Sequence, residues 1–582
     1  MNLRYKRNTG LIAICTFPFL MLSGCGGSGK GVNSSQVTTT RQQTIRPVAI
    51  LPGTTQIPPN DVANYGTFGY STSQTGPGED QGRKLNLMPT SYAGSPNTAR
   101  LISFFSISDI HITDKESPAQ VPYFGWMTPF QAGGLLSQVY SPVMLSTTQV
   151  LDAAIRTINA LHHQTPLDFG ISLGDVANSS QYNELRWFID VMDGKYITPS
   201  SGSHLGAETI GYQKPYQAAG LDRSIPWYEV IGNHDQFWMG VGYPSDKIRN
   251  AMVGSEVLNI GAALLAPNNS ESTGVYVGVI DGTTRYGDVI KGGADRNYAT
   301  PPSVVADPNR RILSTPASTT ANYMNEFLNS TSNPPGHGFN RANSGTTSAC
   351  YTFLPKANIP LKVIVLDDTC KSVNPSAGPA YYGCGWIDAA RLDWLTTELQ
   401  KGQDAGELMI VACHIPINPQ KDLFDTSPSP QFYPGSYRSD TQLISILHNY
   451  SNLILLIAGH RHINAVTPQP SPDQAHPEFG FWEVETPSLR DFPRQFRTFD
   501  ILRNNDNSIS ILTTDVDPVT KPGSPAADSL GYAIGAYRLF GNTTLSDGSS
   551  HVYNAELVKM LTPSMQAKIA LCGSAIGSIV SR

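Results

Sequence analysis

Charged residues are scarce in this sequence: Asp, Glu, Lys and Arg make up 15% of its 582 residues, and the formal net charge is −6. After the first seven residues there is no cluster of Lys and Arg, and a protein that binds nucleic acid needs such a basic face. The apolar run at residues 11–22 is too short to cross a bilayer comfortably. These shortages argue against a nucleic-acid partner and against this run being a membrane span.

The amino-terminal segment instead predicts export. A basic start, MNLRYKR, precedes the apolar run, and together they predict a signal peptide over residues 1–24. The stretch LSGC then resembles a bacterial lipobox, which implies cleavage before Cys25 and lipidation of its thiol; an ordinary cleaved signal is the alternative. Gly26 after the cysteine resembles lipoproteins sent to an outer membrane. We therefore expect a lipoprotein of the bacterial cell envelope, periplasmic or surface-exposed and anchored by acyl chains.

Cysteine is also rare, with seven residues in the chain. Export permits disulfides, and Cys370 and Cys384 flank a loop that a disulfide could close. The sequence does not fix this pairing, and free buried thiols remain the alternative.

The remaining composition is typical of a loop-rich secreted globular protein, with 40% hydrophobic residues and frequent Gly and Pro. Residues 25–98 show little periodicity, which predicts a flexible tether. Short apolar runs then alternate with helical patterns over 99–520, which predicts a layered α/β domain. Within it, 239–360 reads as an inserted subdomain or lid with a hairpin at 274–290. A C-terminal extension, 521–582, contains a helical pattern at 555–572.

Polar residues with metal-binding side chains follow five of the apolar runs. In open α/β sheets, sites form outside the carboxyl ends of strands, so these distant segments could meet at one place. Five of the twelve histidines of the chain lie at these strand ends. The residues are Asp109 and His111, Asp175, Asn233 with His234 and Asp235, His414, and His460 with His462.

The ordered set D-x-H, G-D, G-N-H-D, H and G-H-x-H resembles the calcineurin-like metallophosphoesterase family over about residues 99–516, insertions excluded. The resemblance implies a four-layer α/β/β/α sandwich with a large inserted subdomain. It also implies a binuclear centre of two divalent or trivalent metal ions. In that pattern Asp109, His111 and His462 bind one metal, Asn233, His414 and His460 bind the other, and Asp175 bridges them. Mixed nitrogen and oxygen ligands favour Fe, Mn or Zn.

The same resemblance implies how a phosphate ester would be hydrolysed. A hydroxide that bridges the metals attacks phosphorus, and His234 stabilises or protonates the leaving oxygen. Asp235 would orient the His234 imidazole, with a loop cap as its alternative role. Arg461 could pair with phosphate, but because alternate side chains point opposite ways we favour a structural salt bridge.

The expected activity is hydrolysis of a phosphomonoester or phosphodiester. Purple acid phosphatases carry a tyrosine three residues after the bridging aspartate, where this chain has Asn178, so a tyrosinate-iron centre is not expected. A cyclic-nucleotide phosphodiesterase or an exported nucleotidase is the narrower reading. A catalytically inactive scaffold and a hydrolase of non-phosphate esters are the alternatives. The expected partners are a small phosphate ester and, through the lipid anchor, a membrane; no protein partner is predicted.

Overall fold

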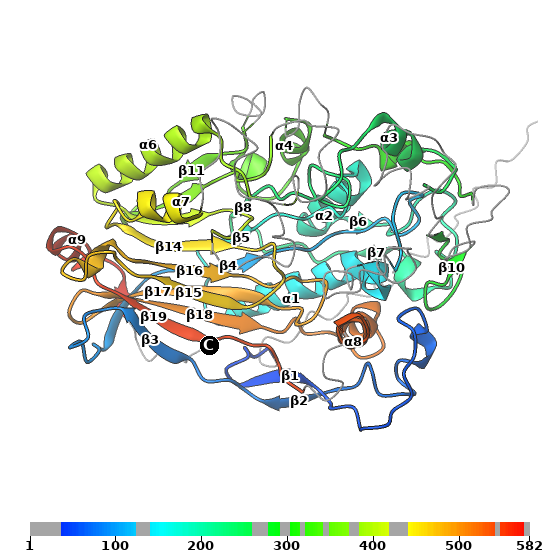
Figure 1. The fold of residues 1–582 in the computed structure, drawn as a ribbon, viewed down its shortest axis with the longest axis horizontal. Coiled ribbons are helices and arrows are strands. Elements are labelled where there is room, and N and C mark those ends of the chain that lie inside the picture. The colour runs from blue at the N-terminus through cyan, green and yellow to red at the C-terminus, as the bar shows by residue number, and fades with distance from the viewer. Residues whose placement is uncertain are drawn as a thin grey trace, which may run out of the picture.

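The computed structural model describes residues 37–123, 140–258, 278–290, 303–314, 321–340, 348–371, 383, 385–417, 440–541 and 548–575. Two large mixed sheets and the helices around them form a mixed α/β fold (Figure 1). The signal peptide and Cys25 lie outside the described residues, as does Cys384. Among the helices of the described ranges, none is long and apolar enough to cross a membrane.

The larger sheet has eight strands, in the order β3-β19-β18-β17-β4-β5-β8 with β20 paired to β4. Strands β4, β5 and β8 run parallel, so their carboxyl ends meet at one edge. The bounds are β3 (Gly82–Leu87), β4 (Asn97–Ile107), β5 (Phe169–Ser172), β8 (Trp227–Glu229), β17 (Phe496–Asn504), β18 (Ile509–Val516), β19 (Ala555–Lys559) and β20 (Ser574–Ala575).

The second sheet has six strands, in the order β11-β12-β13-β14-β16-β15. Strands β12, β13, β14 and β16 are parallel, and an antiparallel strand closes each side. The bounds are β11 (Tyr351–Phe353), β12 (Leu361–Val365), β13 (Leu408–Ala412), β14 (Leu453–Ala458), β15 (Ala465–Gln469) and β16 (Phe481–Glu485).

Alternating side chains divide the core between the two faces of the six-stranded sheet. In β13, Leu408 and Ile410 belong to a buried cluster that also contains residues of the eight-stranded sheet. Met409 and Val411, between them, pack with residues of the helices α6 (Ala389–Ala405) and α7 (Asp440–Leu447). Both faces are apolar because both are covered, as expected of parallel strands. Asp388 caps the start of α6, since its side chain accepts from the backbone N–H of Arg391.

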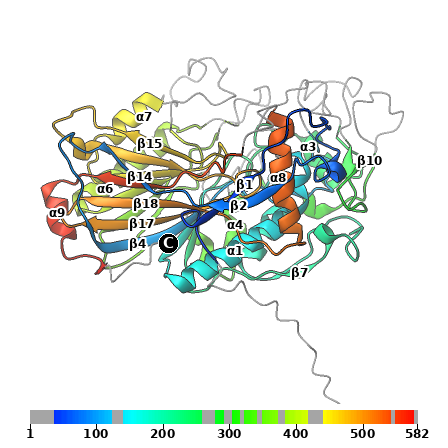
Figure 2. The same cartoon turned by 90° about the horizontal axis from the view of Figure 1, so that it is seen from below.

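Other helices pack on the side of the eight-stranded sheet. Apolar residues on one face of α1 (Thr147–Gln164) and α2 (Tyr182–Met192) join the main core. Helix α8 (Pro525–Gly541) packs against α1 (Figure 2). The shorter helices are α3 (Asp246–Val253), α4 (Ala321–Phe327) and α9 (Pro563–Ile569).

Residues 37–98 differ from the flexible tether that their composition predicts. Strand β1 (Gln43–Pro47) pairs with β2 (Ser73–Pro77), and β3 completes one side of the larger sheet. Tyr65 and Tyr70 are buried against Ala536 and Phe540 of α8. The segment is ordered by contacts with the far end of the chain, which local composition does not reveal.

The predicted helix at 555–572 is wrong in its first half. Ala555–Lys559 is strand β19, paired with β18 and β3, and only Pro563–Ile569 is helical. The predicted hairpin at 274–290 is confirmed where it is described, since β9 (Val279–Ile280) pairs with β10 (Val289–Ile290). A further small pair, β6 (Tyr196–Ile197) and β7 (Tyr216–Gln217), lies between α2 and β8.

Candidate metal centre

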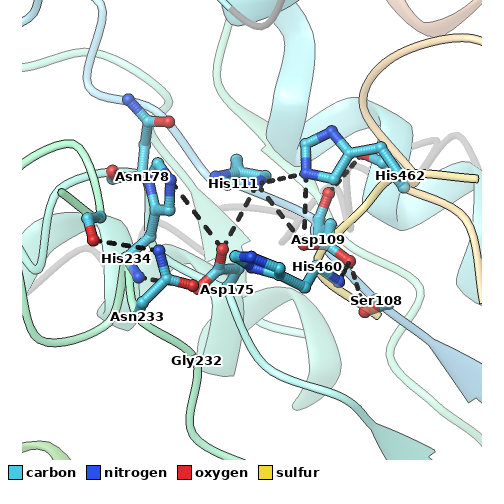
Figure 3. Close-up of polar contacts among 12 residues, drawn as sticks. Ser108, Asp109, His111, Asp175, Asn178, Gly232, Asn233, His234, His460 and His462 are labelled. Atoms are coloured by element: carbon cyan, nitrogen blue, oxygen red, sulfur yellow. Dashed lines mark hydrogen bonds and ion pairs between the residues drawn. The ribbon is translucent and has the colours of Figure 1, made fainter. Parts of the chain in front are cut away.

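The five predicted strand ends meet at one place (Figure 3). Neighbouring parallel strands β4, β5 and β8 deliver the loops with Asp109, Asp175 and Asn233. Neighbouring parallel strands β13 and β14 deliver the loops with His414 and His460. The site therefore lies where the carboxyl ends of two sheets face each other.

One group of donors consists of Asp109, His111 and His462, whose ligand atoms all lie within 4.8 Å of one another. His462 Nε2 is 3.2 Å from Asp109 Oδ1 and 3.2 Å from His111 Nε2. All three side chains are at least nine-tenths buried. Two imidazole nitrogens that close must share a proton or a cation, because two lone pairs would repel.

A second group consists of Asp175, His414 and His460, again with ligand atoms within 4.8 Å. Asn233 joins it, since its Oδ1 is 3.1 Å from His414 Nε2. Asp175 Oδ2 is 3.2 Å from His414 Nε2 and 3.8 Å from His111 Nε2. Asp175 therefore stands between the two groups.

The backbone at these donors is strained. Asp109, His111, Asp175, His460 and His462 all have positive φ, between 46° and 71°. Side-chain-bearing residues rarely adopt this region, and such strain persists only where the surroundings impose it. Five strained donors at one place indicate a functional site.

Two glycines of the strand-end motifs are required by close packing at the donors. A Cβ at Gly232 would collide with Oδ1 of Asp175, and a Cβ at Gly459 would collide with the side chains of Ser108 and Asp109. These glycines let neighbouring loops approach each other, so they shape the site without supplying a ligand.

Carboxylates surround the imidazoles with negative charge. Burial opposes protonation of His414, yet the Asp175 and Asp109 carboxylates and the Leu173 carbonyl together outweigh it and raise the pKa of His414 to about 10. For His462, burial is likewise outweighed by Asp491 and Asp109, and the pKa rises to about 10. A site that draws protons onto imidazoles this strongly also favours cations, which compete for the same lone pairs. The donors therefore fit metal ions.

Hydrogen bonds outside the centre orient the imidazoles. His414 Nδ1 is 2.7 Å from the carbonyl oxygen of Leu173, which can only accept, so Nδ1 carries the proton and Nε2 is left for a ligand bond. His462 Nδ1 is 3.0 Å from Asp491 Oδ2. Sequence reasoning missed Asp491; the available signal was a further strand, β16, which runs parallel to β14 and so ends at the same edge.

His234 lies over the centre but differs from the buried donors. Its side chain is 12% exposed, against 1% for His111. Its Nδ1 is 2.7 Å from the carbonyl oxygen of Asn178, and its Nε2 is 4.0 Å from Asp175 Oδ2. Burial, only partly offset by Asp175, lowers the pKa of His234 to about 4. An exposed edge and a fixed ring suit contact with a substrate.

Asp235 does not occupy the position expected of it. Its carboxylate accepts from the backbone N–H groups of Asp175, Ala177 and Gly232. The Asn178 carbonyl, not Asp235, holds His234 Nδ1. Asp235 is a loop cap, the alternative role considered above, because three converging amides satisfy a carboxylate better than one imidazole.

Two further polar residues have structural contacts. Arg461 forms a two-pronged ion pair with Glu485, and its Nε is 2.7 Å from Oε2, which confirms the predicted salt bridge. His337 is buried with its ring stacked on Trp227 at 3.6 Å between centroids.

Comparison with known proteins finds a weak structural similarity. No family model matches the chain, and no curated protein matches it. Among solved structures, it is similar to a dimetal phosphatase from Danio rerio, with a TM-score of 0.34 and 12% identity. That similarity covers 72% of this chain and 97% of the other. At this level the likeness assigns neither a fold nor an activity to this chain.

Proposed function

We propose that this protein is a two-metal phosphoesterase that hydrolyses a phosphomonoester or a phosphodiester. The observation that carries the proposal is the pair of donor groups that share Asp175 at the meeting point of two sheets. Asp109, His111 and His462 would hold one ion. Asn233, His414 and His460 would hold the other, and Asp175 would contact both.

The donor set favours ions of intermediate hardness. Imidazole nitrogens combined with carboxylate and amide oxygens suit Fe, Mn or Zn. Such ions, when bound, activate water and neutralise charge on phosphate oxygens. The neutral amide of Asn233 adds a donor without adding negative charge opposite an anionic substrate.

His234 would handle the proton at the leaving oxygen. The Asn178 carbonyl keeps its Nδ1 protonated, so Nε2 is the atom that gains and loses a proton. An anionic phosphate beside the imidazole favours its charged form, which opposes the effect of burial. A protonated Nε2 can then donate to the leaving oxygen.

The family resemblance extends the proposal to architecture and cell location. The six-stranded sheet with α6 and α7, and the eight-stranded sheet with α1 and α2, support a four-layer arrangement. The signal-like segment and LSGC support an exported lipoprotein anchored through Cys25. A Cys25→Ser variant should leave the membrane fraction for the soluble fraction; an unchanged membrane association would contradict the anchor.

Metal analysis combined with a substrate panel tests the proposed activity. The purified protein is loaded with Fe, Mn or Zn and assayed on aryl phosphate monoesters and diesters. Two ions per chain with metal-dependent hydrolysis would support the proposal, and the ratio of the two activities would distinguish monoesterase from diesterase. Two tightly bound ions with no turnover of any phosphate ester would favour the inactive scaffold. Turnover of carboxylic esters alone would favour a non-phosphate hydrolase.

A further inference from the structure

Arg490 lies in the loop after β16, with 1% of its surface exposed. Its Nη1 donates to Thr113 Oγ1 at 2.8 Å and to Asn178 Oδ1 at 2.9 Å. The same nitrogen is 3.2 Å from the carbonyl oxygen of His111. One end of the guanidinium is thus fastened between the loops that follow β4 and β5.

The opposite edge of the guanidinium has no such contacts. Arg490 Nε and Nη2 are buried, and among the described residues neither has a hydrogen-bond partner. Three N–H groups are therefore unsatisfied. Nε–H and one Nη2–H point the same way, which is the geometry that binds two oxygens of a phosphate. A buried charge in this condition is costly unless an anion joins it.

Two other buried arginines use that edge for protein contacts. Arg497 directs Nε to the carbonyl oxygen of Glu485 and Nη2 to Asn464 Oδ1. Arg310 directs Nε and Nη2 to Asp114 and Ser201. Arg490 differs in offering this whole edge while being held rigidly at the other end.

The free edge belongs to a residue beside the metal centre. Asn178 holds Arg490 with its side chain and His234 with its carbonyl oxygen, so one residue positions both groups. The guanidinium is also anchored to a proposed ligand residue, since Arg490 Nη1 lies 3.2 Å from the carbonyl oxygen of His111.

We propose that the Nε and Nη2 edge of Arg490 binds two oxygens of the substrate phosphate at the metal centre. This inference rests on the proposed phosphoesterase function. It gives the site a positive group that touches substrate and makes Arg490 a determinant of phosphate affinity.

The test compares Arg490→Lys with the matched control Arg538→Lys in the metal-loaded protein. Lysine keeps the charge but lacks the fork. Arg538 is also buried, but its guanidinium donates to the carbonyl oxygens of Val48, Gly69 and Tyr70 in the amino-terminal segment. Measurements are metal content, KM and kcat on an aryl phosphate, the inhibition constant of inorganic phosphate, and the dissociation constant of inorganic phosphate by titration calorimetry, which requires no turnover.

For Arg490→Lys we expect two ions per chain and a rise of about 10- to 100-fold in both KM and the phosphate inhibition constant. The control should match the wild type in all of these. Wild-type phosphate inhibition in a metal-loaded Arg490→Lys would overturn the inference. If wild type binds phosphate through Arg490 but hydrolyses no ester, the proposed function fails while this inference stands.

A second variant covers the case in which Arg490→Lys loses metal. In Arg490→Ala, added guanidinium ion can occupy the vacated space. Recovery of phosphate inhibition together with metal content would support the inference. Recovery of metal content alone would show that Arg490 only fastens the loops, and would overturn it.

Discussion

Asp175 is the residue on which both groups of donors depend. Its Oδ1 accepts from the backbone N–H of His234, while its Oδ2 faces His414 and His111. Changing it to Asn keeps the shape but removes the charge between the two proposed ions. We expect Asp175→Asn to stay folded and to lose more than about 100-fold in kcat/KM, with reduced metal content. Hydrolysis equal to wild type would contradict the assigned bridge.

Replacing His234 should affect turnover and not metal binding, unlike replacing Asp175. Its ring is held by one carbonyl oxygen and is the more exposed side chain of the site. We therefore expect His234→Ala to retain both ions while kcat falls by about 10²- to 10⁴-fold. The metal content of the purified variant is the decisive measurement, since loss of an ion would identify His234 as a ligand and not a proton donor.

Asp235 links two elements of the fold, because its carboxylate joins the loop that follows β5 to the loop that follows β8. An Asn side chain at this position has only one accepting oxygen, and its NH₂ group would face a backbone N–H. We expect Asp235→Asn to lower the free energy of unfolding by about 1–3 kcal/mol. The midpoint of denaturant unfolding measures this. The pH dependence of kcat should keep its shape, and a shifted profile would restore the role of orienting His234.

Glu229 places a buried carboxyl on β8, just before that loop. Tyr323 donates to its Oε1, while Oε2 has no hydrogen-bond partner among the described residues. Burial raises the pKa of Glu229 well above 4.5, so the folded protein holds a proton that the unfolded chain releases. Stability is then lost as pH rises from about 4.5 towards the folded pKa.

Glu229→Gln removes this titration and keeps an oxygen for Tyr323. The free energy of unfolding of the variant minus that of the wild type should therefore increase from about pH 5 to about pH 8. The increase is about 1.4 kcal/mol for each pH unit over which Glu229 is ionised in the unfolded chain but not in the folded protein. Denaturant unfolding at the two pH values gives the difference. A constant difference would mean that Glu229 is ionised in the fold.

In the whole molecule, local sequence patterns predicted the metal-binding residues at the strand ends. They did not predict features that depend on contacts between segments far apart in the sequence. Apolar runs that end in His, Asp or Asn are local signals, and these runs do converge. Strand β19 was misread because Leu557 and Leu561 are spaced as on a helix face; pairing with β18 and β3 overrides that pattern. Arg490 and Asp491 lie in an irregular loop, where no periodicity indicates which side chains turn inward.

The metal centre also connects the two sheets. Asp109, Asp175 and Asn233 follow strands of the eight-stranded sheet, while His414, His460 and His462 follow strands of the six-stranded sheet. Bound ions would therefore link the sheets at this edge and relieve repulsion among buried carboxylates. A ligand present at 100 times its dissociation constant stabilises a fold by about 2.7 kcal/mol.

Removal of the ions by a chelator should lower the melting temperature, and returning Mn or Zn should restore it. Asp175→Asn should show a smaller shift, because it binds the ions less well, whereas Arg538→Lys should shift as the wild type does. Differential scanning calorimetry of the three proteins with and without metal measures this. Identical melting temperatures for the wild type with and without metal would mean that protein contacts alone hold the donors in place. No ion would then join the sheets.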